Sequence, residues 1–126
     1  MRGQSGVPDE VRYNHELKII EVESYGDVSR DDILESIEKI KRIQTDTGVS
    51  KLLVDTTRQE KLPDSVDIFE IFSAYPRTIK TALLLDRSQA TAEDVEFVET
   101  VALNRGKQMK THVDREQALQ WLAGAD

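Results

Sequence analysis

Two groups of hydroxyl and carboxylate side chains follow apolar runs of the sequence. In KLLVDTTRQE, the run Leu-Leu-Val passes directly into Asp55, Thr56 and Thr57, and Asp86 and Ser88 follow a later apolar run in the same way. Ligands of open α/β sheets bind at the carboxyl edge of parallel strands, so these five residues form a candidate strand-end crevice. The alternative is ordinary loop chemistry, in which such side chains bond to the local backbone.

An Asp that ends a central strand is also typical of receiver domains, which accept a phosphoryl group. A receiver needs an acidic pair after its first strand to hold Mg²⁺. Here that strand ends in Glu21-Val22-Glu23, whose two carboxylates are two residues apart, and a later strand ends in Asp86-Arg87 where a receiver has Lys. The sequence therefore favours a different role for Asp55.

Catalytic and metal-binding motifs are not evident in the sequence. The chain has no cysteine, and His15 and His112 are its only histidines, with no second ligand at metal-binding spacing. A G-x-S-x-G elbow, a G-x-G-x-x-G turn and a Walker A loop are also missing. We therefore expect no metal, no cofactor and no enzyme activity.

Charge and hydropathy limit the partners that the sequence predicts. The 126 residues include 24 acidic and 17 basic side chains, a formal net charge of −7. Nucleic-acid phosphates would be repelled by this excess, whereas a basic protein partner would not. No run approaches the roughly 18 apolar residues that a membrane span needs. We expect a cytoplasmic protein that binds neither nucleic acid nor membrane.

Hydrophobic periodicity and capping residues predict a regular alternation of strands and helices. The predicted elements are strands at Val11–Tyr13 and Leu17–Val22, a helix from Ser29 to Gly48, a strand at Leu52–Val54, a helix from Asp64 or Ser65 to Pro76, a strand at Ile79–Leu85, a helix from Thr91 to Gly106, a strand at Met109–Val113 and a helix capped by Asp114. Trp121, in the last helix, is expected to lie in the core. The order β-β-α-β-α-β-α-β-α predicts an α/β fold with a mixed, mostly parallel sheet. We expect residues 1–9 to form a flexible arm, residues 10–123 to form one domain and residues 124–126 to form a short tail.

Three stretches resemble the STAS domain, in particular the stand-alone SpoIIAA-like proteins, which are similar to anti-sigma factor antagonists. They are SYGDVSRDDILESIEKI, KLLVDTT and THVDREQALQWL, and the likeness covers roughly Leu17 to Leu122. The resemblance implies helices stacked mainly on one face of the sheet. It also implies a non-catalytic regulatory or protein-interaction module, whose specific role the sequence does not name.

The resemblance also implies a candidate phosphorylation switch. Some members carry Asp-Ser-Ser-Gly or Asp-Ser-Thr-Gly at the start of the helix after the central strand, and this chain has Asp64-Ser65-Val66-Asp67. Ser65 matches the switched serine, but the glycine that gives close access to the backbone is replaced by Asp67, which would repel a phosphate. The competing interpretation is that Asp64 or Ser65 is simply the N-cap of the helix.

The candidate partner surface is the loop and helix start that surround Ser65. It consists of Arg58, Glu60, Lys61, Asp64, Ser65 and Asp67. The protein partner is unidentified, and a homodimer is also expected to be feasible if one sheet face is thinly covered. The alternative function is a carrier of a small apolar or anionic ligand. A carrier should have a pocket of several hundred Å³, whereas an interaction module should have an exposed patch.

Overall fold

The computed structural model describes residues 9–26, 29–59, 70–71, 73–76, 78–86, 88 and 91–124. The predicted start of the second helix lies outside these residues, as do Glu60, Lys61, Asp64, Ser65 and Asp67. Of that helix, residues 70, 71, 73 and 74 are described and are helical.

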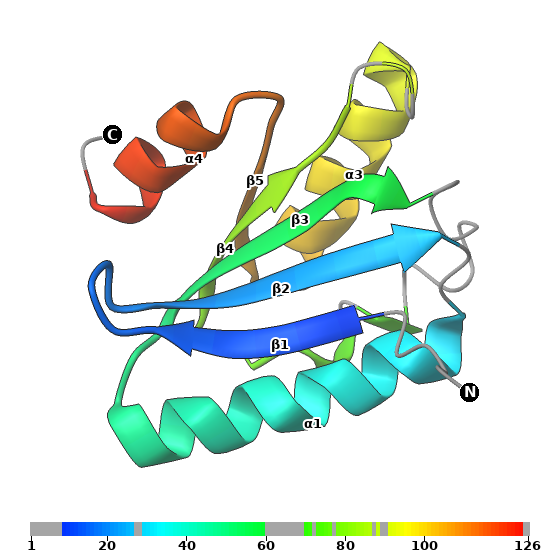
Figure 1. Cartoon of the computed structure of the whole chain (residues 1–126). Helices are drawn as coiled ribbons and strands as arrows, with labels where there is room; N and C mark the ends of the chain where they lie inside the picture. The colour runs from blue at the N-terminus through cyan, green and yellow to red at the C-terminus, as the bar shows by residue number, and fades with distance from the viewer. Residues whose placement is uncertain are drawn as a thin grey trace.

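The described strands form one mixed sheet (Figure 1). They are β1 (Asp9–Asn14), β2 (Ile19–Gly26), β3 (Lys51–Gln59), β4 (Lys80–Leu84) and β5 (Gln108–His112). Their spatial order is the chain order, β1-β2-β3-β4-β5. β1 is antiparallel to β2, and the other neighbours are parallel, so the predicted hairpin and parallel crossovers are confirmed.

Helices cover the two sheet faces unequally. They are α1 (Arg30–Thr47), α3 (Ala92–Asn104) and α4 (Arg115–Leu122). Ile37 of α1 and Val98 of α3 share one apolar cluster, so these helices lie on the same face. Leu122 of α4 packs with Leu53 on the opposite face. α4 contacts β3, β4 and β5, which leaves the β1 end of that face to polar side chains. The predicted stacking mainly on one face is confirmed.

Helix ends follow the capping residues that the sequence predicts. Ser29 Oγ accepts a hydrogen bond from the Asp32 backbone N–H at 3.1 Å, and the Asp32 carboxylate accepts one from the Ser29 N–H at 3.1 Å. Thr91 and Asp94 form the same reciprocal box at the start of α3. Gly48 ends α1 at φ 74°, a left-handed conformation that glycine adopts without strain.

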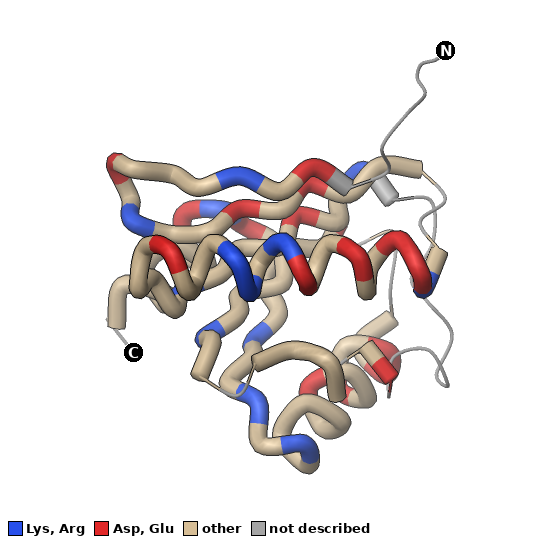
Figure 2. Tube along the Cα trace, turned by 90° about the horizontal axis from the view of Figure 1, so that it is seen from below, with Lys and Arg blue, Asp and Glu red and all other residues tan. Residues whose placement is uncertain are grey.

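The long helix α1 is amphipathic. Ile37 and Ile40 are buried against the sheet. Figure 2 shows acidic and basic residues interspersed along the tube of the same helix. No described helix is long and apolar enough to cross a membrane.

The sequence predicted that the second strand begins at Leu17, but this strand begins at Ile19. Asn14 Oδ1 accepts a hydrogen bond from the Leu17 N–H at 3.0 Å, and the Asn14 carbonyl accepts one from the Lys18 N–H at 2.8 Å. Lys18 adopts a left-handed φ of 57°. The hairpin turn therefore uses Leu17 and Lys18, and the Leu17 side chain is 47% exposed.

The third strand is longer than the predicted Leu52–Val54, because pairing with β2 continues to Gln59. Glu23 pairs with Asp55, but Tyr25 pairs with Arg58, so one extra residue of β3 is accommodated between these positions. Asp55, Thr56 and Thr57 thus belong to a strand and not to a loop. Threonine favours strands, which suits the extension.

Candidate functional site

The sheet face beneath α4 changes from apolar to charged along its strands. Ile19 of β2 and Leu53 of β3 pack with α4. Alternate residues of a strand share a face, so Glu21 and Glu23 continue the row of Ile19, and Asp55 continues that of Leu53. A row of carboxylates therefore follows directly on the apolar contact with α4.

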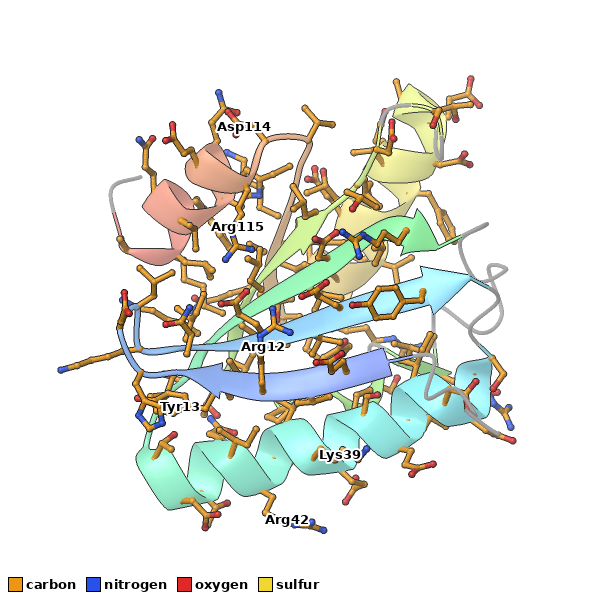
Figure 3. All side chains as sticks on the ribbon, viewed as in Figure 1. Arg12, Tyr13, Lys39, Arg42, Asp114 and Arg115 are labelled. Carbon is orange, nitrogen blue, oxygen red and sulfur yellow. The ribbon has the colours of Figure 1, made fainter. Side chains whose placement is uncertain are left out.

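Glu21 is a buried carboxylate held by residues of two elements, β1 and α4. Its side chain is 4% exposed. Asn14 Nδ2 donates a hydrogen bond to Oε2 at 2.7 Å, and Arg115 Nη2 donates one to Oε1 at 3.0 Å. The Arg12 guanidinium lies 3.7 Å from Oε1. Figure 3 shows Arg12 on β1 and Arg115 on α4 extending toward the sheet between them.

These contacts determine the charge state of Glu21. Burial raises the pKa of its carboxyl, but the hydrogen bonds from Asn14 and Arg115 and the charges of Arg115 and Arg12 outweigh burial. The pKa therefore lies below its ordinary value, and Glu21 is ionised at neutral pH.

A second set of contacts lies at the carboxyl ends of β2 and β3. Arg12 Nη2 donates to Glu23 Oε1 at 2.5 Å, and the Tyr25 hydroxyl donates to Glu23 Oε2 at 2.9 Å. These two hydrogen bonds are the leading causes of a lowered pKa of Glu23. The Arg58 guanidinium lies over the Tyr25 ring, 5.7 Å from its centroid. We call Arg12, Glu23, Tyr25 and Arg58 the β2–β3 corner.

The corner contains the one member of the predicted partner surface that the structure describes, Arg58. From the sequence, Glu23 was considered only as part of the acidic pair of a receiver domain, and Arg12 and Tyr25 were not considered as site residues. The alternation of Glu21, Glu23 and Tyr25 along one strand was a readable signal for a polar row. Their contact with Arg58 depends on the irregular pairing of β2 and β3, which has no evident sequence signature.

The predicted strand-end residues bond within their own segments or to a neighbouring strand. Asp55 Oδ1 accepts hydrogen bonds from the Thr57 N–H at 2.9 Å and the Thr57 hydroxyl at 2.6 Å. Thr56 is buried, and its hydroxyl donates to the Leu84 carbonyl at 2.9 Å. Asp86 Oδ1 accepts from the Ser88 N–H at 3.1 Å. These contacts fix the strand ends, and a ligand role for the five residues stays a prediction.

An open groove of about 620 Å³ lies beside α4, at the carboxyl ends of β4 and β5. Its lining residues are Leu85, Val95, Lys110, Thr111, His112, Val113, Gln117, Gln120 and Trp121. None of the predicted crevice residues lines this groove. Trp121 is partly buried, packs beside the α4 core cluster and lines the groove, whereas the sequence predicted only a core role.

Comparison with known proteins identifies the fold. No protein-family model matches the chain, and no curated protein matches it. The structure is similar to the crystal structure of an uncharacterized protein of the DUF3478 family with a SpoIIAA-like fold from Shewanella loihica PV-4. The sequences are 14% identical, the match covers 90% of this chain and 91% of that chain, and the TM-score is 0.61. The chain thus has a SpoIIAA-like fold, which confirms the resemblance at the level of the fold.

Proposed function

We propose that this chain is a non-catalytic regulatory module of the SpoIIAA-like type, located in the cytoplasm, that binds a protein partner at the β2–β3 corner. The observation that carries the proposal is the organised charged and aromatic patch at the ends of β2 and β3. This patch leads directly into the predicted partner surface, because β3 ends at Gln59 and the surface continues at Glu60.

The composition of the corner suits protein recognition. Tyrosine and arginine are enriched among the residues that dominate binding energy at interfaces. Arg58 is exposed and lies over the partly exposed Tyr25 ring. Hydrogen bonds of Arg12 and Tyr25 to Glu23 already restrict these side chains. Docking would therefore lose less side-chain entropy than docking on free side chains.

The charge of the corner gives a route to regulation. Phosphorylation adds about −1.5 to −2 charges at neutral pH. Ser65 is six residues after Gln59 in the chain, and Lys61 and Asp64 lie between them. Phosphate on Ser65 would change the charge complementarity with a partner, which acts on association rate and specificity. Ser65 is accordingly the proposed switch residue.

A second copy of this chain is an alternative partner, which would make a homodimer. The β5 edge is poorly suited to it, because Glu99 Oε2 accepts hydrogen bonds from the Thr111 N–H at 2.9 Å and the Thr111 hydroxyl at 2.7 Å. An occupied edge N–H is blocked from pairing with another strand. A homodimer would therefore use the charged sheet face near β1 and β2, which α4 leaves open.

A comparative pulldown from an extract of the source cells tests the proposal. The baits are wild type, Arg58→Glu and, as a charge-matched control, Arg42→Glu. Arg42 is exposed on α1 and projects away from the sheet (Figure 3). We expect a partner that wild type and Arg42→Glu retain and that Arg58→Glu loses by about tenfold or more, the effect of a single hot-spot residue. Equal retention by both variants would contradict docking at the corner.

The same pulldown carries a Ser65→Glu bait to test the switch separately. A partner that is captured by wild type and lost by Ser65→Glu, or the reverse, supports regulation at Ser65. Identical partners on wild type and Ser65→Glu would contradict regulation at Ser65 but would not contradict docking at the β2–β3 corner.

A further inference from the structure

The two edges of the sheet differ in how they are protected. β5 forms one edge, where the Glu99 carboxylate accepts a hydrogen bond from the Thr111 N–H. β1 forms the other edge, and no described residue makes an equivalent hydrogen bond to the outer backbone groups of residues 9–13. Alternate residues of an antiparallel strand direct their N–H and C=O groups away from the paired neighbour. The outer side of β1 therefore offers backbone groups to another strand.

β1 also lacks the features that usually blunt a free edge, which are Lys, Pro, a β-bulge or a very short strand. It has six residues, Asp-Glu-Val-Arg-Tyr-Asn, with neither Lys nor Pro among them. Its register with β2 is unbroken from Asp9 to Asn14, so it contains no bulge against β2. Figure 2 shows this strand at the margin of the molecule. β1 is thus a regular edge that is suited to pairing.

The charged residues of β1 are self-complementary about Val11. Glu10 and Arg12 flank Val11 and lie opposite Glu23 and Glu21 of β2, so both belong to the charged sheet face. Two copies of β1 can pair antiparallel about a two-fold axis at Val11. Glu10 of each copy then lies directly opposite Arg12 of the other copy, as an isologous interface requires. Opposite charges that face each other across two strands stabilise the pairing.

Other registers of the same two strands are less favourable. A two-fold axis at Glu10 places two carboxylates directly opposite each other, and an axis at Arg12 does the same with two guanidinium groups. An axis at Tyr13 aligns only residues 12–14 of the strand, whereas an axis at Val11 aligns residues 9–13. The charge pattern therefore selects the register that is centred on Val11.

The side chains of this edge are prepared for such a contact. The Glu10 side chain is 63% exposed and that of Arg12 is 43% exposed, so both are accessible. Arg12 is already oriented by its hydrogen bond to Glu23, which lowers the entropy lost on pairing. On the other sheet face, Val11 packs against the apolar cluster that contains Ile40 but is only partly buried. A second strand alongside β1 would cover more of Val11.

We propose that a second copy of this chain pairs with β1 through its own β1, antiparallel and about a two-fold axis at Val11. The two five-stranded sheets then form one continuous sheet. The contact uses the β1 end of the charged sheet face and includes neither Tyr25 nor Arg58 of the β2–β3 corner. It therefore does not depend on a protein partner at the corner.

Sedimentation velocity of the full chain tests whether the dimer forms. Concentrations from about 1 µM to about 500 µM cover the dissociation constants of weak and moderately stable dimers. We expect the mass to rise from that of one chain to that of two chains across this range. The mass of one chain at every concentration would overturn the proposal and leave the β1 edge to another occupant.

Charge variants test the pairing of Glu10 with Arg12. Glu10→Arg places two guanidinium groups opposite each other in both halves of the interface, and should raise the dimer dissociation constant by about tenfold or more. Glu96→Arg, at an exposed position of α3, changes the net charge equally and should dimerise like wild type. Equal dimerisation of Glu10→Arg and wild type would overturn the proposal. Arg58→Glu should dimerise normally, which separates this contact from docking at the β2–β3 corner.

Single cysteines test the register, because the chain has no cysteine of its own. Val11→Cys places two residues directly opposite each other, with Cβ atoms about 4.5–5.5 Å apart, close to the spacing of a disulfide. Glu16 lies beyond the end of β1, so the thiols of Glu16→Cys would be more than about 20 Å apart. We expect mild oxidation to give a covalent dimer of Val11→Cys and not of Glu16→Cys. A covalent dimer of Glu16→Cys alone would overturn the proposed register. Circular dichroism checks folding, and the exposed Glu10→Arg keeps the test decisive if Val11→Cys fails to fold.

Discussion

Replacing Leu53 by alanine is expected to lower the free energy of unfolding by about 2–5 kcal/mol, the range for large-to-small changes in a packed core. Leu53 is 1% exposed in the middle of β3. It packs with Ile19, Ala82 and Leu122, where β2, β3 and β4 meet α4. The substitution removes apolar surface and leaves a cavity between the sheet and this helix. Urea denaturation followed by circular dichroism measures the change.

Leu103→Ala is the matched control for this experiment. Leu103 lies on α3 and is 75% exposed. Its truncation should change the free energy of unfolding by no more than about 0.5 kcal/mol. An equal decrease in the free energy of unfolding for Leu53→Ala and Leu103→Ala would contradict the packing of α4 against Leu53 on this sheet face.

Replacing Glu21 by glutamine is expected to lower the free energy of unfolding at pH 7 by about 1–3 kcal/mol, because a buried charge-assisted hydrogen bond is weakened. The carboxylate accepts hydrogen bonds from Asn14 and Arg115, and Arg12 lies beside it. Glutamine keeps the shape of the side chain but has no charge for the two guanidinium groups. It also presents an N–H₂ group where Glu21 presented only acceptors.

Glu21 should also contribute to the pH dependence of stability. Its pKa is lowered in the folded chain, so its contribution is present above the unfolded pKa of about 4.3 and is lost as the pH falls through the lower folded value. The free energy of unfolding, measured by denaturation between pH 7 and pH 3, should therefore fall less steeply with decreasing pH in Glu21→Gln than in wild type. Part of this pH dependence should remain in Glu21→Gln, because the pKa of Glu23 is also lowered in the folded chain.

Glu38→Gln controls for the loss of one carboxylate. Glu38 is exposed on α1 and pairs only with Lys41 three residues later, at 3.2 Å, among the ion pairs of the described residues. Such exposed pairs contribute about 0–1 kcal/mol. Equal pH slopes for wild type and Glu21→Gln would show that Glu21 is not held as the structure indicates.

Local sequence signals were sufficient to predict most of the fold. The Ser29–Asp32 and Thr91–Asp94 boxes and the stop at Gly48 act within a few residues, so helix ends can be read directly from the chain. The alternation of strands and helices then predicted the parallel sheet, because crossovers of one hand leave few other arrangements.

Contacts between distant segments could not be predicted in the same way. The extension of β3 to Gln59 depends on pairing with β2 around an extra residue, and Asp55-Thr56-Thr57 is equally typical of a loop. Arg115 contacts Glu21 across 94 positions of the chain. No periodicity joins residues so far apart.

The groove beside α4 was missed for a related reason. His112 and Trp121 come from different elements, and the sequence alone gave the strand position of the first and a core role for the second. Whether Trp121 is fully enclosed depends on how far α4 extends over β5. The structure leaves it partly exposed, with its ring centroid 5.7 Å from that of the His112 ring.

The docking of a protein partner at the β2–β3 corner is tested most directly by hydrogen–deuterium exchange of the full chain, with and without the partner captured in the pulldown. We expect slower exchange at residues 23–26 and 55–59 in the complex, with exchange in β5 and α4 unchanged. Protection confined to β5 and α4, with no change at the ends of β2 and β3, would contradict it.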